Sequence, residues 1–508
     1  MSLLRNASKI SVITLVSRIS GFIRDSIFAM TFGTQEELDI FLLAFKVPNF
    51  LRRIFAEGAC GQAFIPVLSE YLLKESPEAQ KRFLDTLFSL LSLIVTSLAV
   101  VVYCYPDMLV KIFAAGYIPG TQRYDMAVKL MRYIFPYIAF IAWAAFFAAA
   151  LQTKRQFLLP ALIPIILNTV LIGCALGINM GYLDPIYLAW SVPAAGVLQV
   201  LVIGVGYLKH YNWPSFTGAF NDKGVAKVTG LIAMGSYSLA IGQVGAIIDN
   251  NILSNMQPGS VSWMYFTERL CYLPLGVFGI SIITVLSPAL AESFQSGNKK
   301  RFINQLDWAL LSAGLLGIPS ALGLMIFAEP IIMTLFRHGK FNTHDVIMTA
   351  NSLRVMALGV PAFMWVKVLA SAFYTQQDTK TPAWCATVGL VCNLTIAIGF
   401  MQSLQHVSTA MAITAQHYVV MYMLLKRLRS KGVYLVSTEV YKNLAKTVFA
   451  SSAMLITLTV MPTVHAWSEM ALYSQLLNLT AMLIVSIGCF GLVLYSLSWK
   501  LSLVTETS

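Results

Sequence analysis

Basic side chains interrupt the apolar stretches of this sequence at places where a membrane-spanning helix ordinarily carries none. The stretch SRISGFIRD, residues 17–25, contains two arginines and an aspartate, and a second group lies at residues 39–57. Placing an arginine at mid-membrane costs about 2.5–3.5 kcal/mol on insertion scales. Several together indicate a water-filled cavity, acidic partners or an anionic ligand. The basic residues concerned are Arg18, Arg24, Lys46, Arg52, Arg53, Arg132, Arg269, Arg354 and Lys367.

Pairing within the helices explains part of this set. On an ideal helix Arg18 and Asp25 share a face, while Arg24 points about 100° away from Asp25. Asp39 and Lys46 are also spaced to pair along one stripe. The cations still outnumber the carboxylates, and surplus guanidinium suits a phosphate or pyrophosphate, which arginine binds in a bidentate manner. The sets compared are Arg18, Arg24, Lys46, Arg52, Arg53 and Arg269 against Asp25, Asp39, Glu57 and Glu268.

A second polar group is the stretch IIDNN at residues 247–251. A carboxylate with amide oxygens nearby could hold a sodium ion or a proton, although Asp249 could equally cap a helix end. Asn393, which we expect to face inward in a later helix, could join either this site or the arginine site. The sequence therefore leaves a candidate monovalent cation site at Asp249, Asn250 and Asn393.

Membrane-spanning helices must position all of these residues. The 508-residue chain is 57% hydrophobic and 11% charged, whereas soluble domains are about 25% charged. Apolar runs of about 20 residues, the length of a spanning helix, recur along it. We predict an all-α polytopic membrane protein with about fourteen transmembrane helices. They lie near residues 8–32, 38–72, 83–105, 129–152, 160–180, 186–208, 230–254, 261–291, 305–327, 346–374, 382–402, 406–426, 443–462 and 473–497.

The connections between these helices differ in charge. Counted from a cytoplasmic N-terminus, alternate connections are rich in lysine and arginine, ending with KRLRSKG at residues 426–432. The positive-inside rule therefore predicts that both termini are cytoplasmic. Arg132 and Lys367 fit cations that extend toward the membrane surface. Topology thus explains most of the net charge of +12, and we expect no nucleic-acid partner.

An internal repeat occurs at an offset of 222 residues. Because six spans return the chain to its starting side, the two copies have the same orientation, as in transporters that bind substrate between parallel repeats. We predict an N-lobe at residues 1–222, a C-lobe at 223–432 and a C-terminal helix pair at 433–508. The matches are Pro66, Leu68 and Glu70 with Pro288, Leu290 and Glu292, Arg132 with Arg354, and Pro160 with Pro382.

The sequence carries no motif for catalysis. It has no HExxH, GxSxG or P-loop, and its seven cysteines form no CxxC pair. We therefore expect a transporter without enzymatic activity, cofactor or structural metal. Without ATP, coupling would come from a monovalent cation or from the membrane potential, which is worth about 2.3 kcal/mol per charge per 100 mV.

Four stretches resemble a known family. SRISGFIRD, AFKVPNFLRRIFAEGACGQAFIPVLSEY, SWMYFTERL and FYTQQDTKTP closely resemble the MurJ (MviN) family, the lipid II flippases of bacterial peptidoglycan synthesis. The likeness extends over essentially the whole chain. The family belongs to the multidrug/oligosaccharidyl-lipid/polysaccharide exporter superfamily and has two six-helix lobes plus two additional helices, which matches the repeat and the C-terminal pair.

The resemblance implies a substrate and a site. Lipid II, an undecaprenyl pyrophosphate carrying a disaccharide-pentapeptide, would move from the inner to the outer leaflet of the cytoplasmic membrane, with its tail in a groove of the C-terminal pair. Arginines in a cavity would bind the pyrophosphate, with acidic residues nearby. The other partners implied are membrane lipids and cell-wall synthesis proteins. The candidate substrate-binding residues are Arg18, Arg24, Arg52, Arg53, Arg269, Asp25, Asp39 and Glu57.

Three alternatives stay open at this point. The chain could flip another polyprenyl-linked sugar, export drugs or organic cations like other members of the superfamily, or act as a non-transporting scaffold for cell-wall enzymes. A drug antiporter would favour acidic and aromatic cavity residues over surplus arginine. A scaffold would tolerate Arg24→Lys and Arg269→Lys, whereas bidentate phosphate binding would not.

Overall fold

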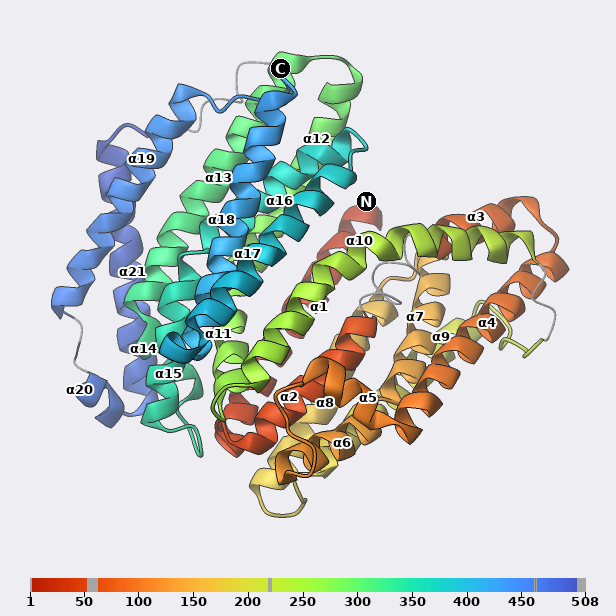
Figure 1. Cartoon of the computed structure of the whole chain (residues 1–508). Helices are drawn as coiled ribbons and strands as arrows, with labels where there is room; N and C mark the ends of the chain where they lie inside the picture. The colour runs from red at the N-terminus through yellow and green to blue at the C-terminus, as the bar shows by residue number, and fades with distance from the viewer. Residues whose placement is uncertain (1, 53–62, 218–221, 461, 463, 500–508) are drawn as a thin grey trace. The chain divides into compact units, whose positions relative to one another are not determined.

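The structure is a computed structural model that describes residues 2–52, 63–217, 222–460, 462 and 464–499 (Figure 1). Within these ranges the chain contains helices and no strand, which confirms the predicted all-α class. Eight helices of the described part are long and apolar enough to cross a membrane, or nine if the bent pair Thr343–Ala357 and Val360–Thr375 forms one span. Other helices of the described part lie at the remaining predicted spans.

The chain divides into two compact units, Met1–Pro258 and Gly259–Ser508. In the first unit, Pro136 separates the two helices of one predicted span, residues 129–152. The predicted span 38–72 corresponds to two helices on either side of residues outside the described ranges. The helices are α1 (Ser2–Phe32), α2 (Glu36–Arg52), α3 (Ile65–Lys74), α4 (Pro77–Cys104), α5 (Pro106–Phe113), α6 (Gln122–Ile134), α7 (Tyr137–Thr153), α8 (Leu158–Asn179), α9 (Tyr187–Leu208) and α10 (Lys223–Ser254).

The second unit contains the helices that follow Pro258. Its predicted span 261–291 contains a five-residue π-helix, Leu275–Gly279, directly after Pro274. A 3₁₀ segment, Ala453–Val460, extends α19. The α-helices are α11 (Ser260–Pro274), α12 (Ile280–Gln295), α13 (Lys299–Ile326), α14 (Ala328–Phe336), α15 (Thr343–Ala357), α16 (Val360–Thr375), α17 (Lys380–Leu404), α18 (His406–Ser430), α19 (Thr438–Ser452), α20 (Val464–Glu469) and α21 (Leu472–Ser496).

Polar side chains define where several helices begin. Ser76 precedes α4 and accepts a hydrogen bond from the backbone of Ala79, and Asp222 does the same for α10. Asn342 and Asp345 form a capping box at the start of α15. These residues satisfy backbone N–H groups that the first helical turn leaves without partners.

The helix bounds reproduce the sequence repeat. Shifted by 222 positions, α4 coincides with α13 at both ends, and α6 and α7 coincide with α15 and α16 to within one residue. The short helices α5 and α14, which the sequence did not indicate as separate elements, also correspond to each other. The repeat therefore includes the helical breaks as well as the spans.

The packing boundary differs from the predicted lobe boundary at residue 222. α10 belongs to the first compact unit. Both of its ends form hydrogen bonds with other residues of that unit. At its N-terminus the Tyr71 hydroxyl donates to Asp222 (3.0 Å), and near its C-terminus Asn251 accepts from the backbone N–H of Ala115 (2.8 Å). The repeat and the compact units are thus two different divisions of the chain.

The C-terminal helices belong to the second unit. α19 packs against α13, and α21 packs against α14 and α19. Trp467 in α20 donates from Nε1 to Thr334 Oγ1 in α14 (3.2 Å), and both side chains are buried. The segment predicted as a separate helix pair at residues 433–508 is therefore part of a larger compact body over its described residues.

Candidate anion-binding site

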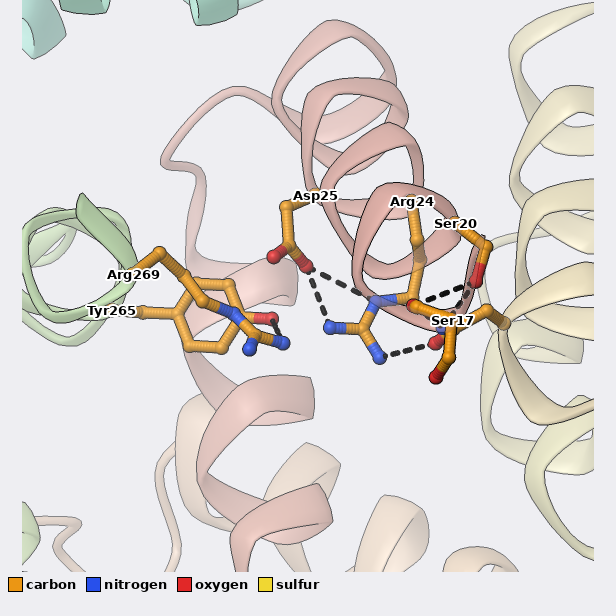
Figure 2. A network of polar contacts seen from close by, with 7 residues as sticks. Ser17, Ser20, Arg24, Asp25, Tyr265 and Arg269 are labelled. Carbon is orange, nitrogen blue, oxygen red and sulfur yellow. Dashed lines mark hydrogen bonds and ion pairs between the residues drawn. The ribbon is translucent and has the colours of Figure 1, made fainter. Parts of the chain in front are cut away.

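Arg24 and Asp25 form a buried ion pair in the middle of α1. Figure 2 shows the guanidinium lying against the carboxylate, with Arg24 5% exposed and Asp25 1% exposed. Nη2 of Arg24 is 2.7 Å and Nε is 3.1 Å from Oδ1 of Asp25. The Phe28 ring lies on the same side chain, with its centroid 5.7 Å from Cζ. A buried ion pair is tolerated only where hydrogen bonds satisfy it, as they do here.

Asn168 in α8 completes this arrangement. Its Oδ1 accepts from Nη1 of Arg24 (3.0 Å), and its Nδ2 donates to the hydroxyl of Ser20 (2.9 Å) and to the carbonyl of Ser17 (3.4 Å). Ser20 in turn donates to the carbonyl of Ser17 (2.9 Å). The amide therefore fixes the guanidinium from a second helix. Sequence reasoning missed Asn168, although an asparagine inside an apolar helix is itself a signal.

The partner of Asp25 differs from the sequence-based expectation. Ideal helical geometry favoured Arg18, whereas the structure pairs Asp25 with its neighbour Arg24. The directions of the Cβ atoms differ by about 100°, but the long arginine side chain bends back to reach the carboxylate. Arg18 is exposed at its position in α1. The prediction of an Arg18–Asp25 pair was therefore wrong about which arginine is neutralised.

Asp39 also has a different partner from the one expected. It is fully buried in α2, and its Oδ2 lies 3.8 Å from Nη2 of Arg123 in α6. Arg123 is 3.0 Å from Glu36 and stacks over the ring of Tyr117, 4.3 Å from its centroid. The expected pairing of Asp39 with Lys46 is wrong, because Arg123, which the sequence placed in a connection, reaches back to α2.

Lys46 instead binds the IIDNN stretch. Its Nζ donates to Oδ1 of Asn250 (2.8 Å), so an ammonium group occupies one of the oxygens proposed to hold a cation. Asn251 binds the end of α5, and Asn250 is 2% exposed. Asn393 is fully buried in α17 of the second unit, where its amide has no hydrogen-bond partner among the described residues. The structure describes Asp249 and Asn393 in separate units.

Arg269 is the candidate site residue of the second unit. It is exposed on α11, and its Nη2 donates to the hydroxyl of Tyr265 one turn earlier (3.2 Å), as Figure 2 shows. Its Cζ lies 5.3 Å from the centroid of the same ring. Arg52 is the last residue of α2, and its side chain lies outside the described part, as do Arg53 and Glu57. Arg269 is therefore an exposed cation, whereas Arg24 is buried.

A family model described as lipid II flippase MurJ matches residues 28–478. The chain belongs to the MurJ family. The probable lipid II flippase MurJ of Vibrio cholerae is 31% identical, over 98% of this chain and 97% of that protein. The lipid II flippase MurJ of Burkholderia cenocepacia is 33% identical over 85% of each chain. Membership in MurJ places the chain among transporters and makes it a multi-pass membrane protein.

Solved structures agree with the MurJ assignment. A lipid II flippase MurJ in an inward closed conformation has a TM-score of 0.80 at 27% identity and covers 96% of this chain and 97% of that one. An inward-facing multidrug resistance transporter of the MATE family has a TM-score of 0.65 at 12% identity, covering 83% and 98%. The second likeness shows the shared fold alone. The expected superfamily fold is thereby confirmed.

Proposed function

We propose that this chain flips lipid II from the inner to the outer leaflet of the bacterial cytoplasmic membrane. Membership in the MurJ family supports this function over another polyprenyl-linked sugar, a drug or a scaffold role. The observation that carries the proposal is Arg24, a guanidinium held within a membrane helix by Asp25 and Asn168. Such a group suits a pyrophosphate headgroup, because arginine binds phosphate oxygens in a bidentate manner.

The geometry of Arg24 suggests how binding begins. In the structure Nε and Nη2 both face Asp25, while Nη1 faces Asn168. A pyrophosphate carries more charge than a carboxylate, so it can replace Asp25 on the Nε–Nη2 edge while Asn168 keeps the third nitrogen in place. Between transport cycles Asp25 pairs again with the Nε–Nη2 edge of Arg24 and holds the guanidinium in place. Arg18, Arg52, Arg53 and Arg269 supply further phosphate contacts in this proposal, with Asp39 and Glu57 as acidic partners.

Transport proceeds by alternating access and needs no ATP in this proposal. With both termini in the cytoplasm, a membrane that is negative inside draws an empty, positively charged site back toward the inner leaflet. Each charge contributes about 2.3 kcal/mol per 100 mV. A loaded site is closer to neutral and is pulled less. The α19–α21 pair holds the lipid tail, as its exposed Phe449, Ile484 and Leu492 suit.

Two further elements complete the proposal. A monovalent cation bound by Asp249, Asn250 and Asn393 would contribute to coupling only after Lys46 leaves the amide oxygen of Asn250. Cell-wall synthesis proteins are proposed partners that receive the exported precursor. Neither element is needed for the headgroup to bind, so each is tested apart from it.

Depletion of the chain in cells, followed by measurement of lipid II exposed on the outer leaflet, tests the function. Exposure should fall and return with the unmodified chain, while Arg24→Ala should not restore it. Thr169→Val is a matched control, because Thr169 follows Asn168 but is exposed on α8. Normal exposure after depletion, in cells without another flippase, would refute the proposal. If collapse of the membrane potential leaves exposure unchanged, only the resetting step fails.

A further inference from the structure

A groove lined largely by aromatic side chains, and not by Arg24, lies on the first unit. It has a volume of about 380 Å³, and its walls come from the end of α4, the break between α6 and α7, and the start of α9. Tyr133 and Trp190 stack across it with ring centroids 4.6 Å apart. The lining that matters below is Tyr103, Tyr133, Phe140, Trp190 and Val197.

The groove is open at the surface of the first unit, where several of its lining side chains are exposed. Tyr103 is 46%, Trp190 48% and Val197 41% exposed, and α4 and α9 are both apolar enough to cross a membrane. Tyr103 is in the last turn of α4 and Trp190 in the first turn of α9. Val197 is seven residues further along α9, or about 10 Å. The groove therefore extends from the interfacial aromatic layer toward the hydrocarbon, a path that suits an acyl chain.

Arg132 places a positive charge beside this groove. Its Cζ is 5.9 Å from the centroid of the groove-lining Tyr103 ring. Nε of Arg132 is shielded from solvent and has no hydrogen-bond partner among the residues that the structure describes. Over the described part of the chain, no carboxylate forms an ion pair with Arg132. An apolar groove with one cation at its polar end is complementary to a lipid with an anionic headgroup.

Comparison with the second copy of the repeat shows that an arginine without an ion pair at this position is specific to the first copy, over the described residues. Arg354 corresponds to Arg132 at the offset of 222, but its Nη2 lies 2.5 Å from Glu329. The counterpart of Glu329 is Asp107, which accepts instead from the hydroxyl of Tyr124 (3.2 Å). The same arginine is thus neutralised in the second copy only, because Tyr124 diverts the equivalent carboxylate in the first.

We propose that the groove binds an anionic phospholipid, with its phosphate on Arg132 and one acyl chain along Tyr103, Trp190 and Val197. Under the predicted topology this lipid belongs to the outer leaflet. The site is distinct from the lipid II headgroup site and does not depend on the proposed function. A phosphate oxygen can accept from the shielded Nε and from the outer nitrogens of the guanidinium.

Native mass spectrometry of the full chain with added phosphatidylglycerol or phosphatidylcholine of matched acyl chains tests the proposal. The unmodified chain should retain the anionic lipid preferentially. Arg132→Gln should lower its retention about five-fold, the contribution of one basic group near a phosphate, and abolish the preference. Arg354→Gln, the matched variant in the second copy, should leave both unchanged. Thermal unfolding confirms that each variant is folded.

The position of the lipid acyl chain relative to Trp190 gives a second measurement. Phosphatidylglycerol brominated on its acyl chain should quench tryptophan fluorescence, and Trp190→Phe should remove part of that quenching. Equal retention of both lipids by the unmodified chain, or equal losses in Arg132→Gln and Arg354→Gln, would overturn the proposal. Displacement of the bound phospholipid by undecaprenyl phosphate at equal concentration would also overturn it, because the groove would then hold a polyprenyl chain.

Discussion

The two copies of the repeat share their helix bounds but not their charges. α1 carries Arg18, Arg24 and Asp25, whereas the positions 222 residues later, in α10, are Ala240, Ala246 and Ile247. Helix lengths and breaks are therefore shared by the two copies, while the two arginines and the aspartate of the first helix exist in one copy only. Packing constrains both copies alike, whereas under the proposed function the headgroup needs a cation in only one of the two equivalent helices.

The supporting residue follows the same asymmetry. Asn168 in α8 corresponds to Leu390 in α17, so the second copy lacks both the arginine and the amide that holds it. α17 has its own buried amide, Asn393, which corresponds to Leu171. Each copy thus buries one asparagine in this helix, at a different position. The asymmetry extends to the groove, where Arg132 and Arg354 differ in their partners.

The largest expected effect comes from Arg24. Arg24→Lys should lower lipid II flipping about a hundredfold, because lysine cannot keep the bonds to Asp25, Asn168 and a phosphate, and each charge-assisted bond contributes about 1.5–3 kcal/mol. The measurement is lipid II exposure in cells that depend on the variant. The second copy has Ala246 at the position of Arg24, so the control is the same substitution at another arginine, Arg354→Lys, which keeps its ion pair with Glu329 and should stay near normal. Equal losses in both variants would remove the functional asymmetry.

A second pair of contacts compares stability between the copies. In the first copy Asp39 of α2 meets Arg123 of α6, whereas in the second Trp263 of α11 donates to Asp345 of α15 (3.2 Å). Arg123→Gln should lower the free energy of unfolding by about 2 kcal/mol, because it removes the charge facing buried Asp39. Trp263→Phe should cost about 1 kcal/mol, one hydrogen bond.

Thermal unfolding of the purified chain measures both variants. Arg123→Lys is the control for the first, since it keeps the charge and should recover part of the loss. A larger loss for Trp263→Phe than for Arg123→Gln would show that the ion pair is not the stronger link between equivalent helices.

Asn168 should have a smaller effect than Arg24. Asn168→Leu, which installs the residue type of the second copy, should weaken lipid II binding about tenfold by releasing one bond to a charged group. Asn168→Asp keeps an acceptor for Arg24 and should recover most of the affinity. Binding of lipid II to the purified chain gives the affinity, and Thr169→Val serves as the control. Failure of Asn168→Asp to differ from Asn168→Leu would mean that Asn168 only fills space.

The helical segments, the repeat and the position of Arg24 inside an apolar helix could be predicted because each leaves a pattern along the sequence. Apolar periodicity fixes helices locally, and a charge in an apolar run stands out. Asn168 could not be assigned to Arg24, since their contact spans 144 positions and depends on how α1 packs on α8. The pairing of Asp25 was missed because helical angles describe Cβ directions and not the reach of a long side chain. Arg123 was assigned to a connection because the predicted span begins at residue 129, whereas α6 begins at Gln122.

The turn before α17 should give the smallest effect. Lys431 lies 2.5 Å from Asp378, and Thr381 donates to the same carboxylate. Burial raises the pKa of Asp378, but these bonds outweigh it and lower that pKa from 3.8 to about 2. Because the folded-state pKa is depressed, the stabilisation is present above about pH 4 and is lost as pH falls toward 2.

Asp378→Asn should therefore lower the free energy of unfolding by about 1 kcal/mol at neutral pH, a value reduced for the partly exposed lysine. The corresponding residue of the first copy, Gln156, carries no charge, so Gln156→Ala is a matched control that should show no pH-dependent difference. Thermal unfolding between about pH 3 and pH 7 should show the Asp378→Asn difference shrinking as the solution becomes acidic. A difference that is constant over this range would mean that the charge of Asp378 does not stabilise the turn, and that the two copies close this connection equally well without it.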